Sequence, residues 1–282
     1  LEAGQVNAVY DVPAAEASRF KGRKEFVLQS PTASNSLFLF ELAPNRYKPL
    51  QDVRVRRAIA MCLDKEAIKQ NVYFGEGDIQ WSPLPKSSWA YIEPAGVPYD
   101  PEGAKRLLAE AGYPTGFKMT IDFTPAAMAR EIPLAIQDGL REVGIELEIR
   151  THEPTAFVDL AQGRGNQVRG DLFATTFSET TGFFTGARNL LGCNRPQPNN
   201  PAVIFYCNPE WDRLFDQALQ ERDPPRRAAI YRQLVGLTRE DVIALFFATR
   251  SSYFVQSPKL RGFEAPVPNA SGFTLDSVYK VR

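Results

Sequence analysis

The chain has 282 residues, with 33 basic and 33 acidic side chains and a formal net charge of zero at pH 7. This balance argues against binding to nucleic acid, which normally needs a clustered excess of lysine and arginine. A single histidine, His152, and three cysteines also exclude the Cys/His sets of structural zinc sites and the HExxH motif.

The first 110 residues predict helices, a strand and one long loop. A short apolar run over 36–40 indicates a buried strand, and Asp52 is placed to cap an amphipathic helix that begins at Val53. Residues 75–101 are irregular and rich in glycine, proline and aromatic rings. An ordered loop of this kind packs against another part of the protein or lines a ligand-binding site, so Trp81 is a candidate ligand contact.

The clearest pattern lies over 117–149. Apolar residues alternate with polar ones over 117–123, recur at helical spacing over 132–143 and return over 145–149. The first strand should therefore bury one face, with Asp122 on the other. Two parallel strands joined by a helix belong to an α/β sheet, which is the fold class that we expect.

The remaining elements carry similar signals. Proline follows a capping residue at Asp100, Asn208 and Asp223, which predicts three helix starts. The other segments expected after residue 150 are a helix over 154–162 and strands over 171–177, 243–247, 253–255 and 273–281.

Two candidate binding segments follow strand ends, where ligands bind in open α/β sheets. Arg130 lies between the strand ending at Phe123 and the next helix, where its guanidinium could hold a carboxylate. The alternative is a solvated arginine on the first helical turn. The segment 177–184 mixes rings, hydroxyls and a carboxylate, which is typical of a small-molecule pocket. The alternative is that its rings belong to the core and its carboxylate is a surface charge. Its candidate contacts are Phe177, Glu179, Thr181 and Phe184.

The three cysteines and the single histidine are interpreted as structural residues. Cys193 and Cys207 bracket a loop rich in proline and asparagine, and a disulfide there would indicate an oxidising compartment, although two free thiols are the alternative. Cys62 lies on the buried face of a helix. His152 follows a strand, and we interpret it as an exposed strand-end residue rather than a catalytic base.

Several segments together resemble the extracellular solute-binding proteins of ABC importers in the dipeptide, oligopeptide and nickel group, known as family 5. The similar segments are Pro49-Leu-Gln-Asp-Val-Arg-Val-Arg-Arg-Ala-Ile-Ala-Met-Cys-Leu-Asp-Lys-Glu-Ala-Ile68, 99–112, 140–147 and Cys207-Asn-Pro-Glu-Trp-Asp212. They occur in the family's order and cover nearly the whole chain.

This resemblance implies a fold of the periplasmic binding protein-like type II, with two lobes that close on a ligand. The chain would supply the second lobe (42–246) and flanking parts of the first lobe (1–41 and 247–282), and the N-terminal half of the receptor would be missing. Leu1 would then be a cut within a lobe. Asn35 would lie at the hinge, which makes it another candidate ligand contact.

The resemblance also assigns residue roles. Arg130 matches an arginine that binds the peptide carboxylate in dipeptide-binding members, and Cys193 and Cys207 match a disulfide of those members. Where peptide binders have Asp-Pro-Asp for the ligand's ammonium group, this chain has Gly182-Phe183-Phe184. The ligand would therefore be a peptide, with Glu179 supplying the lost charge, or another small solute.

We therefore expect a periplasmic or lipid-anchored receptor that performs no catalysis, needs no cofactor or metal, and delivers a solute to the membrane subunits of an ABC permease. Two alternatives stay open. One is a carboxylate-based hydrolase using a pair drawn from Asp122, Glu153 and Glu179. The other is a receptor for a metal bound to an organic chelator, since one histidine is too few for an all-protein site.

Overall fold

The structure is a computed structural model. It describes the chain apart from residues 13, 30–35, 45, 76–77, 83, 85–90, 92–95, 126–127, 162–168, 179–192, 194–207, 250–252, 263–278 and 281–282.

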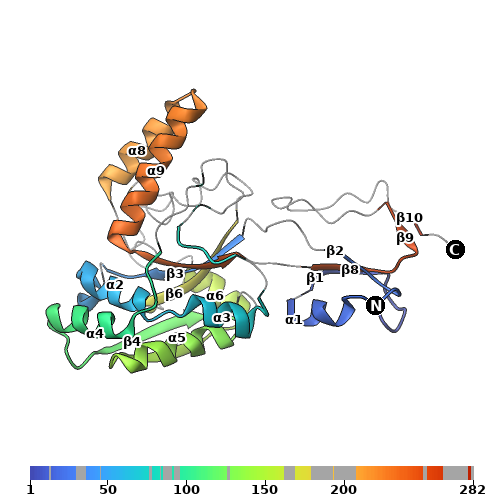
Figure 1. Cartoon of the computed structure of the whole chain (residues 1–282), viewed down its shortest axis with the longest axis horizontal. Helices are drawn as coiled ribbons and strands as arrows, with labels where there is room; N and C mark the ends of the chain where they lie inside the picture. The colour runs from blue at the N-terminus through green and yellow to red at the C-terminus, as the bar shows by residue number, and fades with distance from the viewer. Residues whose placement is uncertain are drawn as a thin grey trace.

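The larger sheet has five strands in the order β5-β4-β6-β3-β7, and three of them, β3, β4 and β6, are labelled in Figure 1. β4 pairs in parallel with β5 and β6, whereas β3 runs antiparallel to its neighbours β6 and β7. The strands are β3 (Ser36–Leu42), β4 (Lys118–Phe123), β5 (Glu146–Thr151), β6 (Leu172–Ser178) and β7 (Ala244–Thr249). The mixed α/β architecture confirms the predicted fold class.

Helices cover both faces of this sheet. On β7, Leu245 and Phe247 join the core formed with α2, α4 and α5, while Ala244 and Phe246 join a second core with α8 and α9. This alternation is expected, because successive strand residues point to opposite faces. The helices are α2 (Val53–Met61), α3 (Lys65–Val72), α4 (Pro101–Glu110), α5 (Glu131–Glu142), α6 (Pro154–Ala161), α8 (Pro209–Gln220) and α9 (Pro224–Asp241).

Five helices begin at a capping side chain that accepts a hydrogen bond from a backbone N–H two or three residues further on. The capping residues are Asp52, Asp64, Asp100, Asn208 and Asp223. These bonds satisfy N–H groups that have no partner inside the helix. The helix starts predicted from proline and capping residues are thus confirmed.

The predicted βαβ unit is present as β4, α5 and β5. Met119, Ile121 and Phe123 of β4 are buried under α5. The loops at its ends meet closely: Gly116 and Gly144 both have positive φ angles, and a Cβ atom on Gly116 would lie 1.9 Å from the Gly144 oxygen. Glycine is therefore required at position 116 for both conformation and space.

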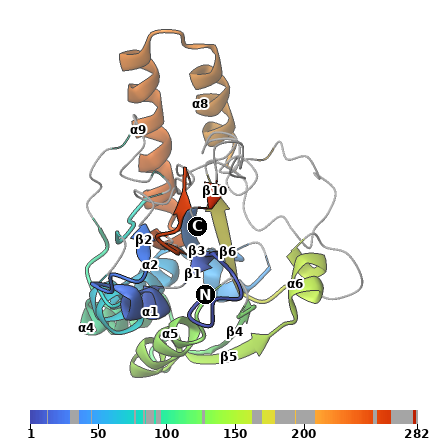
Figure 2. The same cartoon turned by 90° about the vertical axis from the view of Figure 1, so that its right-hand side faces the viewer.

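α8 and α9 form an antiparallel hairpin that stands above the large sheet in Figure 2. The ring of Trp211 stacks on that of Phe215 with centroids 5.3 Å apart, and Leu234 and Val235 of α9 complete the core between the helices. The hairpin rests on the start of β7 through the same core.

A smaller sheet contains strands from distant parts of the chain, β1 (Ala8–Val12), β2 (Val27–Gln29) and β8 (Tyr253–Gln256), in the antiparallel order β1-β8-β2. It lies beside the five-stranded sheet in Figure 1 and packs with α1 (Ala14–Ala17), which precedes a 3-10 turn over Ser18–Phe20. A second 3-10 turn, Lys48–Gln51, precedes α2. A further pair joins β9 (Leu260–Arg261) to β10 (Tyr279–Lys280).

The chain passes twice between the two main sheets. β2 and β3 belong to different sheets, and so do β7 and β8. The predicted lobe boundaries at 41/42 and 246/247 fall inside β3 and β7, so both strands reach across those positions within the large sheet. The strands predicted over 243–247 and 253–255 are confirmed as β7 and β8, whereas most of 273–278 lies outside the described residues.

Candidate functional site

The predicted site lies at one edge of the large sheet. Ser178, the last residue of β6, pairs with Ser36, the first residue of β3. The segments after β6 and before β3 therefore start at the same edge, beyond the carboxyl end of a strand. This edge is where ligands bind in open α/β sheets.

Only part of this edge is described. Phe177 is a backbone partner of Leu37 in the β3–β6 pair, but its side chain is outside the description. Four of the other candidate contacts, Asn35, Glu179, Thr181 and Phe184, lie outside the described residues. Their roles stay predictions.

Arg130 is an exposed residue at the start of α5, where it takes the N-cap position in helical conformation. Its side chain forms no capping hydrogen bond. In the same connection, Thr124 directly follows β4 and is buried, and its hydroxyl oxygen has no hydrogen-bond partner among the described residues. The location predicted for Arg130, between the end of β4 and α5, is confirmed, and its ligand contact stays a prediction.

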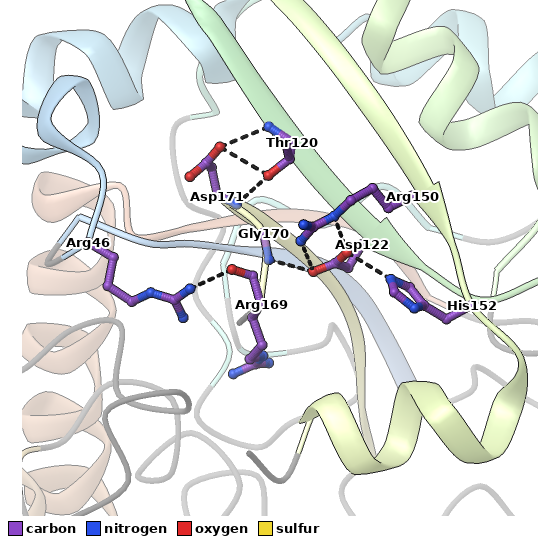
Figure 3. Close-up of polar contacts among 8 residues, drawn as sticks. All are labelled: Arg46, Thr120, Asp122, Arg150, His152, Arg169, Gly170 and Asp171. Atoms are coloured by element: carbon purple, nitrogen blue, oxygen red, sulfur yellow. Dashed lines mark hydrogen bonds and ion pairs between the residues drawn. The ribbon is translucent and has the colours of Figure 1, made fainter. Parts of the chain in front are cut away.

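A polar cluster lies on the face of the sheet opposite the α5 core (Figure 3). Its centre is Asp122, whose side chain is fully buried. The Nε and Nη2 atoms of Arg150 donate to the two carboxylate oxygens of Asp122 over 2.7 and 2.8 Å, and His152 Nε2 lies 2.8 Å from Oδ1. The Gly170 N–H donates to the other oxygen, Oδ2. Both oxygens of Asp122 are thus engaged, which anchors β4, β5 and the start of β6 to one another.

A second carboxylate supports the same junction. Asp171 Oδ2 accepts hydrogen bonds from the Thr120 N–H over 2.8 Å and from its hydroxyl over 3.1 Å. Arg46 Nη2 donates to the Arg169 carbonyl over 2.5 Å. Burial lowers the pKa of the Arg46 guanidinium from its ordinary value, and the nearby carboxylates of Asp171 and Asp122 oppose that shift. The cluster pairs cations with carboxylates and fixes the backbone where β6 begins.

Two expectations from the sequence are wrong at this cluster. His152 is not an exposed strand-end residue, since its side chain is 18% exposed and contacts Asp122. Asp122 is on the polar face of β4 as predicted, yet that face is buried at this end of the strand because Arg150 and the chain near Gly170 cover it. Strand alternation gives the side on which a residue lies but not what packs there.

Trp81 lies elsewhere, on the wall of a cavity of about 300 Å³ between α2, α9 and β7. The Lys65 ammonium nitrogen is 3.8 Å from the centroid of the Trp81 ring. Lys65 was not among the site residues predicted from the sequence, and it directly follows Asp64, the capping residue of α3. Nothing in that local pattern indicates that the lysine is buried.

Cys62 is buried, as predicted, and its thiol donates to the Ala58 carbonyl over 3.2 Å. Burial raises the pKa of this thiol to about 12. Cys207 lies outside the described residues, so the pairing with Cys193 stays a prediction.

The described residues contain neither a membrane-spanning helix nor a metal-binding cluster. None of the described helices combines the length and apolarity required to cross a bilayer. The described residues also hold no group of three or more His, Cys, Asp or Glu side chains arranged for a metal ion.

The fold is that of the type II periplasmic binding proteins. The dipeptide-binding protein of Pseudoalteromonas sp. SM9913, solved in complex with Met-Leu, superimposes with a TM-score of 0.84 at 25% sequence identity, covering 99% of this chain and 55% of that protein. The oligopeptide-binding protein AppA of Bacillus subtilis, solved with a nonapeptide, gives 0.83 at 20% identity, covering 100% of this chain and 57% of that protein.

The chain belongs to the family described as bacterial extracellular solute-binding proteins, family 5, whose middle-region model matches residues 1–196. The glutathione-binding protein GsiB of Pectobacterium atrosepticum is 28% identical over 269 residues, 93% of this chain and 51% of that protein. Heme-binding protein A of Haemophilus influenzae is 28% identical over 290 residues, 100% of this chain and 50% of that protein. The chain thus spans about half the length of these curated relatives.

Proposed function

We propose that this chain is part of the substrate-binding component of an ABC importer, which captures a peptide or another small solute by closure of two lobes. The observation that carries the proposal is the double passage of the chain between the two sheets, through β3 and β7. Closure about such a connection is the motion of periplasmic binding proteins. Family membership supports the same function.

In this proposal the chain contributes residues 42–246 as the second lobe and residues 1–41 and 247–282 as parts of the first. The rest of the first lobe comes from the other half of a receptor about twice as long as this chain, a size supported by the half coverage of its relatives. The receptor works in the periplasm, free or lipid-anchored, and hands its ligand to the membrane subunits of the permease.

The ligand occupies the edge of the large sheet where β6 ends and β3 begins. Arg130 binds its anionic group, supported by the exposure of this arginine beside the end of β4. A guanidinium holds a carboxylate with two parallel hydrogen bonds, which fixes orientation as well as charge. Asn35, Phe177, Glu179, Thr181 and Phe184 supply the remaining contacts, while Trp81, also predicted as a contact, lies in a cavity away from this edge.

No catalytic step is assigned to this chain. Asp122, one of the carboxylates considered for a hydrolase, is fully buried with both oxygens accepting hydrogen bonds, which supports a structural role. We also propose that Cys193 and Cys207 form a disulfide. The burial of Cys62, the third cysteine, as a free thiol within the α2 core supports this pairing.

The test of the ligand site is titration calorimetry on the complete receptor with Met-Leu, glutathione and heme as probes. For the probe that binds, Arg130→Ala should weaken binding at least roughly tenfold, because a charge-assisted hydrogen bond is lost. Arg141→Ala is the matched control, since Arg141 is an exposed arginine near the other end of α5 that pairs with Asp138.

Three outcomes would contradict the proposal. Equal affinities of the Arg130→Ala variant and the unchanged receptor would remove the role of Arg130. Turnover of a bound probe would favour the hydrolase. Failure of all three probes, together with binding of nickel in the presence of histidine, would favour the receptor for a metal chelate.

A further inference from the structure

The cavity that contains Trp81 lies away from the predicted ligand edge. Its walls include Ala244, Leu245 and Phe246, which form the start of β7. The predicted ligand edge is at the opposite end of that strand, where Thr249 pairs with Leu37. The cavity is therefore separate from the predicted ligand edge of the large sheet. Its volume is about 300 Å³.

Lys65 is a buried residue of the cavity lining. It is the first residue of α3 and is 8% exposed. Its ammonium nitrogen donates to the Gln80 carbonyl over 3.0 Å and faces the ring of Trp81. An ammonium group has three N–H donors, so these contacts do not exhaust it. Burial lowers the pKa of Lys65 to about 7, the consequence of holding a cation where water is scarce.

The ring of Trp81 is fixed from another side by Gly96. A Cβ atom at position 96 would lie 2.6 Å from Trp81 Cδ2, so the backbone of Gly96 packs directly on the indole. The wall beside Lys65 is thus an aromatic surface packed against backbone. An aromatic wall of this kind favours a ligand with a flat or compact apolar body.

Among the described residues that line the cavity, the charged side chains are cations. They are Lys65 from α3, Arg57 from α2 and Arg239 from α9, and the described part of the lining holds no aspartate or glutamate. Arg57 and Arg239 are exposed, whereas Lys65 is buried. The rest of the lining is mainly apolar. Two exposed cations and one buried cation complement a negative group that enters from solvent.

We propose that this cavity binds a small monocarboxylate with an apolar body, its carboxylate on Lys65 and its apolar part against Trp81 and the start of β7. A carboxylate accepts from an N–H of the Lys65 ammonium beyond the one that Gln80 receives within the described residues, and the apolar body is removed from water. The volume is at the lower end of small-molecule pockets, which restricts the ligand to about ten non-hydrogen atoms. This inference is independent of the proposed receptor function.

The test uses the complete protein and 3-phenylpropionate as the probe, with 3-phenylpropanol as its uncharged analogue. Calorimetry should give saturable binding of the carboxylate with a Kd of roughly 1 mM or below, and binding of the alcohol at least about tenfold weaker. Lys65→Met should weaken binding of the carboxylate at least roughly tenfold. Lys69→Met, a change of a lysine on the same helix that does not line the cavity, should leave it unchanged.

A second variant keeps the test decisive if Lys65→Met does not fold. Ala60→Leu adds bulk to the cavity wall without changing a charge and should also abolish binding, as its larger side chain occupies the space of the ligand. Circular dichroism should show that this variant is folded.

Any of several results would overturn the proposal. These are absence of saturable binding up to about 10 mM, equal affinity for the alcohol, and equal weakening by Lys69→Met. A loss of binding with Arg130→Ala but not with Ala60→Leu would also overturn it, because the probe would then occupy the ligand edge instead.

Discussion

The Asp122 cluster gives the sharpest prediction for stability, because a fully buried carboxylate holds two basic side chains. Asp122→Ala removes the acceptor of Arg150, His152 and the Gly170 N–H together. Removing one partner of a buried ion pair typically destabilises a protein by about 3–5 kcal/mol, since the other charge stays behind unpaired.

The expected magnitude is at the lower end of this range. The Arg150 side chain is 34% exposed, so water replaces part of the lost interaction. We therefore expect Asp122→Ala to lower the free energy of unfolding by about 3 kcal/mol. Asp122→Asn keeps an oxygen for the Gly170 N–H but places an NH₂ group against a guanidinium donor, so we expect a loss of about 2 kcal/mol.

The assay is urea-induced unfolding combined with native-state hydrogen exchange of the amides of β4, β5 and β6. The control is Asp138→Ala, which breaks the ion pair with Arg141 on α5, where both side chains are more than half exposed. Such surface pairs contribute about 0–1 kcal/mol. If Asp122→Ala destabilises the protein no more than Asp138→Ala does, the cluster does not hold the three strands together.

Two further predictions concern Lys65 and the glycine loops. The free energy of unfolding of the unchanged protein should rise relative to that of Lys65→Met between pH 7 and 9, by up to about 1.4 kcal/mol per pH unit. The reason is that the unfolded lysine keeps its proton in this range, while the folded one, with a pKa of about 7, loses it; a difference that does not change with pH would contradict this. Gly116→Ala should destabilise the protein by at least about 2 kcal/mol more than Gly112→Ala, because both glycines have positive φ but a Cβ at 112 meets no atom within 4 Å. Thermal unfolding of the two variants compares them, and equal losses would show that the contact with Gly144 is unimportant.

The elements were predictable from the sequence where their signals are local. Asp100 and Asp223 identify helix starts because the capping carboxylate lies two or three residues from the N–H groups that it accepts. The alternation through Met119 and Ile121 gave the buried face of β4, because the strand period depends only on its own residues.

The polar sites depended on contacts between distant residues. Lys65 follows a helix cap, a position that is usually solvated, and it is buried because Gln80 and Trp81 fold over it. Asp122 finds its partner Arg150 on the neighbouring strand and Gly170 at the start of a third. The pattern of residues within one segment does not indicate such contacts between residues distant in the sequence. Arg130 was located from sequence because strand ends and helix starts alone define its position.

The pairing of β3 with β7 limits how the smaller sheet moves relative to the larger one. The two strands that lead toward β1, β2 and β8 are hydrogen-bonded neighbours as far as the Leu37–Thr249 pair. A single connecting strand would leave the smaller sheet free to rotate about the strand axis. Two strands that are hydrogen-bonded neighbours where they approach the smaller sheet resist such rotation. We therefore expect the two sheets to bend toward each other more readily than they twist.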